Sequence, residues 1–512
     1  MSTTELPEAG ALSPALANSQ PTLLSQQTLS DLPSSIEVPH YDRGALTPSV
    51  VHIGVGGFHR AHQAMYFDDL ARQGISTDWG IVGVGLHRPQ MGEVLSEQDN
   101  LYTVVTRGPD RDDVRVVGAL VDYLFAPEDP EQVLRALAAP STRLVTLSIT
   151  GTAYPSLPLD PEQEDVRADV EHPEAPGTAF GYLVEGLNRR RRSGVEAFTV
   201  LSCDNVQNNG VATRNAVLAT ARLRDPELAE WIEASVSFPG SMVDRITPET
   251  TPEGRDDIAG EHGVDDQWPV ITEPFRQWIV EDRFCNDRPP LDQVGVQFVD
   301  DVHPYEVMKT RMLNGAHSAL GHLGHLAGFE TTDQAMANPV LQGFVRGYLQ
   351  EVSQLLPGVP GIDLDDYIDT LVERFSNPQI SDQLSRLCRR SSTKVPSYVL
   401  PSVRAALDAD VPRGHLVLAV AAWLRYLRGE DYAGRPYEIE DAKADRLQPL
   451  AMEGDTDPRA LLAQHDVFEA LGECPRFTRE VEEALHLLEA GPLEAASSAA
   501  ASMVVLRDGS AA

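Results

Sequence analysis

The segment HPYEVMKTRMLNGAHSALGHLG, from His303 to Gly324, holds four polar residue types that could move a proton. Its apolar residues recur at helical spacing, which predicts one helix over most of the segment. At ~100° per residue, Glu306 and His317 lie ~60° and ~80° from Lys309 around the helix axis. Asn314 lies ~140° from Lys309, so the four polar side chains share one face of a mostly apolar helix.

A lysine on such a dry face is costly to keep charged, so its amine becomes a usable base. Lys309 could then accept the proton of an alcohol whose hydrogen leaves as hydride to a nicotinamide. The Asn314 amide could stabilise the developing alkoxide, and His317 could orient the lysine or bond the substrate oxygen. Glu306, near the helix start, could pass protons to solvent. Spacing alone leaves an alternative open, in which the lysine reaches water, the helix breaks at Asn314 and His317 is a core histidine.

A glycine-rich turn follows an apolar run of strand length, PSVVHI, and precedes a helical pattern. The turn reads GVGGFH, similar to the dinucleotide-binding fingerprint, in which glycines let the backbone approach a pyrophosphate at a helix start. His59 stands in place of the third glycine, so the match is partial. The predicted cofactor-binding residues are the turn and the strand end before it: Ile53, Gly54, Val55, Gly56, Gly57, Phe58 and His59.

The end of the second predicted strand, GIVGVGL, bears on the identity of the cofactor. Proteins that bind NAD commonly place a carboxylate there to bind a ribose hydroxyl. This chain offers His87 and Arg88 instead. A cation at this place could receive the 2′-phosphate of NADP, so these residues leave the cofactor open between NAD and NADP, and Arg88 is a candidate binding residue. The alternative is that Arg88 is simply solvated.

Strand-length apolar runs separated by helical patterns continue to about residue 290, which is typical of βαβ units around a mainly parallel sheet. Further along, helical periodicity dominates. We therefore predict an α/β protein with a Rossmann-type domain at 40–295 and a mostly α-helical substrate domain at 296–490. Residues 1–39 are rich in Ser, Pro and Thr and predict a disordered leader, and residues 491–512 predict a low-complexity tail.

The 512 residues include 77 acidic and 41 basic side chains, a formal net charge of −36. Nucleic acids are bound through basic surfaces, so a nucleic-acid partner is not expected. No apolar run is long enough to cross a bilayer, and the first residues lack the positive charge of a targeting signal, which predicts a cytoplasmic protein without a membrane partner. Four dispersed cysteines predict reduced, buried thiols and no metal site. The oligomeric state stays open and a monomer is plausible.

Several segments together resemble the mannitol 2-dehydrogenase family of polyol-specific long-chain dehydrogenases. They are the glycine turn at Val51–Gln63, SCDN at Ser202–Asn205, VSFPGSMVDRITP at Val236–Pro248, EPFRQWIVEDRF at Glu273–Phe284 and KTRMLNGAH at Lys309–His317. The later segments PGIDLDDYIDTLVERFSNPQISDQL and RLCRRSSTKVPSYVLPS complete the likeness, which runs from about residue 40 to 440.

The resemblance implies a zinc-independent, NAD(P)-dependent oxidoreductase and gives roles to matching residues. Lys309 matches the general base, and Asn205 and Asn314 match a pair that stabilises the oxyanion. His317 matches a supporting residue, and Glu306 matches a position linked to proton movement. Hydrogen-bonding groups of this kind discriminate polyol hydroxyls, because an unfilled polar site is left unpaired. The residues that match the lining of the sugar site are Asp244, Arg386 and Lys394.

The implied reaction is D-mannitol + NAD+ = D-fructose + NADH + H+, a polyol–ketose interconversion. D-arabinitol 4-dehydrogenase and fructuronate (mannonate) reductase chemistry are alternatives, the second because Arg386 and Lys394 could hold a uronate carboxylate. A catalytically inactive nucleotide-binding scaffold is an alternative of another class. The chain departs from the family's usual acidic residue after the second strand, and from its common TEGGY, which reads TGTAY at Thr150–Tyr154.

Overall fold

The computed structural model describes residues 20–499, which belong to two compact units divided between Val302 and His303. The division falls later than the predicted boundary at 295/296. Residues 297–299 stay with the first unit because strand β14 (Gln297–Val299) pairs in parallel with β13 (Gln277–Glu281).

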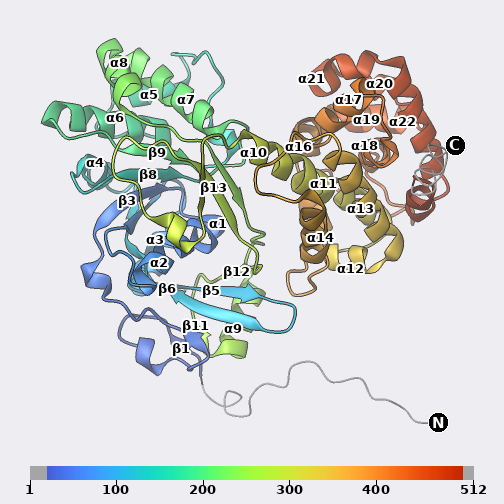
Figure 1. Ribbon diagram of the computed structural model, residues 1–512. Coiled ribbons are helices and arrows are strands. Elements are labelled where there is room, and N and C mark those ends of the chain that lie inside the picture. The colour runs from blue at the N-terminus through green and yellow to red at the C-terminus, as the bar shows by residue number, and fades with distance from the viewer. Residues whose placement is uncertain (1–19, 500–512) are drawn as a thin grey trace, which may run out of the picture. The chain divides into compact units, whose positions relative to one another are not determined.

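A five-stranded, wholly parallel sheet forms the centre of the first unit (Figure 1). The strand order is β7-β4-β3-β8-β9, with the first of these along the chain, β3, in the middle. This is the Rossmann order, and it confirms the predicted fold class. The order reverses between β3 and β8, the place where such sheets bind their ligands. The strands span Pro48–Ile53 (β3), Gly80–Gly85 (β4), Leu120–Phe125 (β7), Leu144–Leu147 (β8) and Thr199–Ser202 (β9).

Helices cover both faces of this sheet, because successive residues of a strand point to opposite sides. Val51 and Val200 pack with side chains of α4, α6, α7 and α8. Their neighbours Val50 and Leu201 pack with side chains of α2 and α3. The helices of this unit are α1 (Gly57–Ala61), α2 (Gln63–Arg72), α3 (Gln90–Glu97), α4 (Pro130–Ala138), α5 (Glu164–Glu171), α6 (Ala179–Ser193), α7 (Asn209–Arg224), α8 (Pro226–Ser235) and α9 (Pro252–His262).

Three smaller sheets extend the first unit. One has the order β12-β5-β6-β2, in which only the β5–β6 pair is antiparallel. The others are β10-β13-β14 and the pair β1-β11. The new strands span Thr22–Leu23 (β1), Ile36–Glu37 (β2), Tyr102–Arg107 (β5), Asp112–Val117 (β6), Ser241–Asp244 (β10), Val264–Asp265 (β11) and Val270–Thr272 (β12). Short 3₁₀ turns lie at Leu29–Asp31 (η1), Arg43–Ala45 (η2), Gly151–Ala153 (η3) and Leu291–Val294 (η4).

The prediction of a disordered leader up to residue 39 is wrong for residues 20–39. β1 pairs with β11, β2 pairs with β6, and Leu24 and Ile36 are buried in a small apolar cluster. Sequence-distant strand partners fix this polar-looking segment, and composition cannot reveal such partners. Residues 1–19 lie outside the described part of the chain.

The second unit is helical, and its central helix α11 (Gly315–Leu326) packs against α13, α15, α16 and α18. The further elements are α10 (His303–Lys309), the π-helical turn η5 (Thr310–Asn314), α12 (Thr332–Ala337), α13 (Pro339–Ser353), α14 (Leu364–Phe375), α15 (Leu384–Cys388), α16 (Ser391–Tyr398), α17 (Leu400–Asp408), α18 (Gly414–Tyr426), α19 (Ala444–Gly454), α20 (Arg459–Leu462), α21 (His465–Phe468), η6 (Glu469–Glu473) and α22 (Pro475–Leu488). This confirms the prediction of a helical second part.

The C-terminal stretch is helical where the structure describes it. Residues 492–499 form a helix with Ala495 and Ala496 fully buried, so the predicted tail begins later than residue 491. Residues 500–512 lie outside the described part. Between residues 20 and 499, no helix has both the length and the apolar character required to cross a bilayer. All four cysteines are free thiols, and Cys285 and Cys474 are only partly buried.

Candidate active site

The glycine turn follows β3 and begins at the switch point of the parallel sheet. Gly54 has φ +102°, and a Cβ there would lie 2.3 Å from the carbonyl oxygen of Ser148. Only glycine fits both the backbone conformation and the contact with the loop after β8. A Cβ at Gly56 would meet nothing nearer than 3.9 Å, so the backbone there is open to approach. An exposed backbone before a helix start fits the pyrophosphate of a dinucleotide.

The remaining predicted residues of this turn divide into two groups. Val55, Gly57 and Phe58 are partly exposed with the glycines, whereas Ile53 and His59 are buried. The ring of His59 stacks on His52 of β3, with 3.4 Å between ring centroids, and burial lowers the pKa of both imidazoles. His59 therefore occupies the space between α1 and the sheet, at the position where the third glycine of the fingerprint allows helix and strand to pack closely.

Arg88 lies just beyond the carboxyl end of β4, the strand beside β3, and is exposed. That strand end is where a Rossmann-type domain recognises the ribose of its dinucleotide. The last residue of β4, Gly85, is covered by Tyr123 of β7, since a Cβ there would lie 1.9 Å from the Tyr123 hydroxyl. The structure thus provides a cation and a phenol at this edge.

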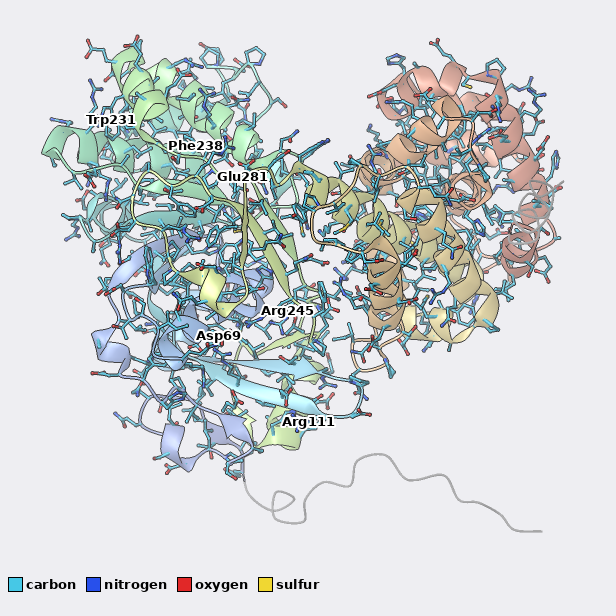
Figure 2. The ribbon with its side chains drawn as sticks, in the orientation of Figure 1. Asp69, Arg111, Trp231, Phe238, Arg245 and Glu281 are labelled. Atoms are coloured by element: carbon cyan, nitrogen blue, oxygen red, sulfur yellow. The ribbon has the colours of Figure 1, made fainter. Side chains whose placement is uncertain are left out.

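Asn205 and Asp244 follow or end strands of the first unit. Asn205 is exposed, three residues after β9 ends, whereas Asp244 closes β10 and is only 3% exposed. The next residue is Arg245, which is labelled in Figure 2. It donates hydrogen bonds to the carbonyl oxygens of Glu273 and Ala61, so it ties β10 to the end of α1. The Val-Asp-Arg signature is therefore partly a packing device.

The lysine helix begins at His303 and continues without a break to Leu326. Residues 310–314 form a π-helical turn, in which each residue turns the chain by less than the ~100° of an α-helix. Around the helix axis, Asn314 and His317 therefore lie at smaller angles from Lys309 than a uniform α-helix predicts. The alternative of a helix break at Asn314 is wrong. Tyr348 donates a hydrogen bond of 3.3 Å to the Arg311 carbonyl in this turn.

Close packing holds the π-helical turn in place. A Cβ on Gly315 would lie 2.2 Å from the Tyr348 hydroxyl, so glycine is required where the α-helix resumes. Lys309 is 5% exposed and Glu306 is 9% exposed, which agrees with the predicted dry face. Glu306 lies 3.9 Å from the exposed ring of His303, on the side of the helix start.

The imidazole of His317 is surrounded by cations. Its ring stacks on Phe375 with 4.1 Å between centroids. Burial, followed by the charges of four cations, lowers the pKa of His317 well below its ordinary value, so the ring is neutral at neutral pH. The cations are Arg386, Arg374, Lys394 and Lys309. The predicted residues Lys309, Arg386 and Lys394 thus come together with His317 in the second unit.

Arg386 and Lys394 are held by different partners. Arg386 makes a two-pronged ion pair with Asp382, with 2.7 Å between Nε and Oδ1. The Lys394 ammonium donates to the Leu387 carbonyl at 3.0 Å. Burial, and then the charge of Arg386, lowers the pKa of Lys394 to about 8. The lysine can therefore lose its proton at mildly basic pH.

Sequence reasoning missed three residues of this cluster. Asp382 stands four residues before Arg386, a helical ion-pair spacing that the sequence already displays. Arg374 and Phe375 carry no such signal, because only the packing of α14 brings them to His317. His322 and His325, further along the same helix, lie against Tyr426, and His322 also bonds Ser391 at 2.7 Å.

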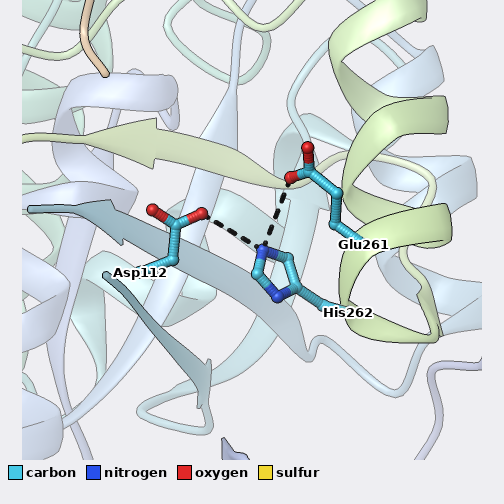
Figure 3. A group of neighbouring side chains, drawn as sticks. All are labelled: Asp112, Glu261 and His262. Carbon is cyan, nitrogen blue, oxygen red and sulfur yellow. Dashed lines mark ion pairs between the residues drawn. The ribbon is translucent and has the colours of Figure 1, made fainter. Parts of the chain in front are cut away.

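A separate cluster of possible metal ligands lies in the first unit. In the described part of the chain, Asp112, Glu261 and His262 are the three side chains of this kind that gather within 4.8 Å (Figure 3). Arg107 lies 3.3 Å from Glu261 and 3.9 Å from Asp112. Because the guanidinium lies within ion-pair distance of both carboxylates, we interpret the cluster as an ion-pair network.

A Rossmann-type unit with an open glycine turn, followed by a helical unit with a lysine, an amide and an imidazole on one helix face, defines a dinucleotide-dependent dehydrogenase. Residues 48–293 match the Mannitol dehydrogenase Rossmann domain, and residues 301–489 match the Mannitol dehydrogenase C-terminal domain. The chain belongs to the mannitol dehydrogenase family.

Named relatives are similar over nearly the whole chain. The mannitol 2-dehydrogenase of Aspergillus fumigatus is 43% identical over 91% of this chain and 96% of its own length. The structure of Pseudomonas fluorescens mannitol 2-dehydrogenase in a ternary complex with NAD and D-mannitol has a TM-score of 0.85 and 40% identity, covering 94% of this chain and 99% of that one. A substrate-free D-sorbitol dehydrogenase has a TM-score of 0.83 and 37% identity, covering 92% and 99%.

Proposed function

We propose that this protein interconverts D-mannitol and D-fructose with NAD as its cofactor. The observation that carries the proposal is the face of Lys309, Asn314 and His317 on a buried helix, in a chain whose Rossmann-type unit has an open glycine turn. The relative solved with NAD and D-mannitol supports the choice of cofactor and substrate.

The cofactor would be held by the turn at Gly54–Gly57, with Arg88 at the ribose edge. When bound, NAD supplies the acceptor for the hydrogen that leaves the alcohol carbon. An exposed arginine also accommodates a 2′-phosphate, so NADP is the second candidate cofactor.

Lys309 acts as the general base that takes the proton of the reacting hydroxyl. It is 5% exposed, and an amine removed from water is costly to keep charged. The sequence contains only three lysines, Lys309, Lys394 and Lys443, among 41 basic residues. Because an arginine cannot release its proton, lysine at 309 and 394 fits a chemical role.

The amides and the carboxylate complete the proposed chemistry. Asn314 donates to the substrate oxygen as it becomes an alkoxide, and Asn205 has the same proposed role. His317, neutral and stacked on Phe375, orients a hydroxyl by hydrogen bonding. Glu306, close to the exposed His303, passes the proton toward solvent. No step of this scheme calls for zinc.

Reduction of fructuronate is the second candidate function. Arg374, Arg386 and Lys394 all lie close enough to His317 to lower its pKa, and a uronate carboxylate fits side chains of this kind. Asp244, in the first unit, has the proposed role of a hydroxyl acceptor for either substrate.

The experiment is a steady-state assay of the purified protein with D-mannitol, D-arabinitol and fructuronate, each with NAD or NADP and the matching reduced forms. We expect the highest kcat/KM with D-mannitol and NAD, unchanged by a strong chelator. A higher value with fructuronate would favour the second candidate. Absence of turnover with all three would refute the polyol function, and loss of activity with the chelator would refute zinc independence.

A further inference from the structure

Thr150, at the carboxyl end of the loop after β8, has a backbone conformation that few residues adopt. Its φ is +70° and its ψ is 152°, a region used almost only by glycine. A β-branched side chain makes this conformation still less favourable. Such strain persists only where surrounding contacts hold it, and it gathers at functional sites.

The contact that holds Thr150 is the buried carboxylate of Asp204. The Thr150 N–H donates to Asp204 Oδ1 at 2.7 Å, and the Ile149 N–H bonds the same carboxylate. Tyr154 donates to Oδ2 at 3.0 Å. Asp204 is 7% exposed, and burial raises its pKa, so these donors compensate a carboxylate that is costly to bury.

The strained loop is also joined to the glycine turn. The Ser148 hydroxyl donates to the Gly54 carbonyl at 2.8 Å, and the Ser148 N–H donates to the Ile53 carbonyl at 3.0 Å. The close approach of Gly54 to the Ser148 carbonyl leaves no room for adjustment. Residues 148–150 therefore connect the end of β3 to the carboxylate that follows β9.

Asp204 is also the residue immediately before the exposed Asn205. Its carbonyl accepts hydrogen bonds from the Val206 N–H at 2.8 Å and from the Asn209 side chain at 3.2 Å. Asn209 in turn exchanges two hydrogen bonds with the backbone of Ser241. Both the side chain and the carbonyl of Asp204 are thus fixed, which limits where Asn205 can stand.

We propose that Asp204 is a positioning residue, which holds Thr150 in its strained conformation and thereby fixes Asn205 and the glycine turn in one arrangement at the edge of the sheet. Its catalytic consequence rests on the proposed function, in which Asn205 donates to the substrate oxygen. Asp204 itself touches no reacting atom in this scheme. The carboxylate sets distances between two loops whose ends must serve one reaction.

The test is a double-mutant cycle with Asp204→Ala and Thr150→Gly. Asp204→Ala should lower kcat by ~100-fold, since a misplacement of about 1 Å is enough for such a loss. Glycine holds the same backbone conformation without strain, so Asp204→Ala in the Thr150→Gly background should cost less than ~10-fold. Thr150→Gly alone should leave the melting temperature equal or higher.

Two matched variants separate positioning from general damage. Asp204→Asn keeps one oxygen for the N–H donors and should restore most of kcat. Tyr154→Phe removes the Oδ2 contact, together with the contacts of the same hydroxyl to Ser202 and Thr213, but keeps both N–H donors. It should therefore cost less than Asp204→Ala. Binding of NADH, measured by fluorescence, should change by less than ~3-fold in Asp204→Asn. The reason is that the carboxylate itself contacts no part of the cofactor in the proposed scheme.

Urea unfolding of the four proteins of the cycle needs no substrate and tests the strain directly. These proteins are the wild type, the two single variants Asp204→Ala and Thr150→Gly, and the double variant. The loss of stability from Asp204→Ala should be smaller in the Thr150→Gly background. If the wild type is active and Asp204→Ala costs the same kcat and the same stability in both backgrounds, the positioning role of Asp204 is refuted and the proposed function still stands. A wild type inactive on every polyol would instead refute the proposed function and the catalytic consequence with it, whatever the unfolding data show.

Discussion

The glycine turn and the lysine helix place polar groups by opposite means. Around the turn, the backbone segments that follow β3 and β8 approach one another directly, and Gly54 is required because a Cβ has no space. On the lysine helix, the proposed chemistry belongs to side chains, and a π-helical turn at 310–314 changes their angular positions around the helix axis. In the first region, close backbone contact fixes the positions of the groups. In the second region, their positions depend on the angle at which each residue leaves the helix axis.

The difference follows from what each region must do. A pyrophosphate is recognised by backbone N–H groups, so the backbone must come close to it and hold still. In the proposed function Lys309 accepts a proton, and a buried amine gives up its charge more readily than a solvated one. We therefore expect changes in the glycine turn itself to affect cofactor binding and stability, and changes on the lysine helix to affect kcat.

The largest effect is expected from Lys309→Ala. Loss of a general base lowers kcat by ~10²–10⁴-fold, while NADH binding to the other unit should stay within ~3-fold. Lys443→Ala is the matched control, since that lysine pairs with Asp466 at 3.0 Å on the surface and should leave kcat unchanged. Steady-state kinetics and NADH fluorescence measure both. Parallel loss of turnover and NADH binding would show that Lys309 is a structural residue.

Gly54→Ala should come next. A clash with the Ser148 carbonyl together with strain at φ +102° should lower the free energy of unfolding by about 2–4 kcal/mol and weaken NADH binding. Gly74→Ala separates the two causes, because Gly74 has φ +67° and open space around it, so only strain of about 1 kcal/mol applies. Urea unfolding gives the comparison. Equal losses at both positions would contradict a steric role for Gly54.

Acidification should weaken the fold through its buried histidines. Burial lowers the pKa of His322 to about 3, so below an unfolded pKa of about 6.5 only the unfolded chain takes up this proton. Stability from this group is complete above pH 6.5 and falls by up to ~1.4 kcal/mol per pH unit as pH drops toward 3. His322→Gln should remove that share of the slope, measured by urea unfolding at pH 7, 6 and 5. An unchanged slope would contradict a neutral buried imidazole.

The smallest effect is expected from Arg88→Ala. The side chain is exposed, and exposed ion pairs contribute up to about 1 kcal/mol, so KM for NADP should rise about 2- to 5-fold. KM for NAD should change less. Initial rates with both cofactors measure the ratio. A larger rise for NAD than for NADP would place Arg88 outside 2′-phosphate recognition.

Sequence patterns predicted the main elements because each has a local cause. Apolar strand-length runs and the glycine turn predicted the parallel sheet, and 3.6-residue periodicity predicted the lysine helix. The leader was predicted wrongly because β1 and β2 have partners far along the chain, β11 and β6. The angular positions of Asn314 and His317 needed correction, since a π-helical turn leaves no mark in the spacing of apolar residues.

By itself, the sequence determined which residues are available for chemistry: a glycine turn after a strand, and a lysine, an amide and a histidine along one helix. Residue types and local spacing are enough to predict these groups, because helical and strand periodicity are properties of neighbouring residues. Only the tertiary structure decided that Arg374, Arg386 and Lys394 lie near His317 and that Asp204 bonds Thr150, because these groups lie tens of residues apart along the chain. Contacts between distant residues depend on how whole elements pack, and no local pattern records them.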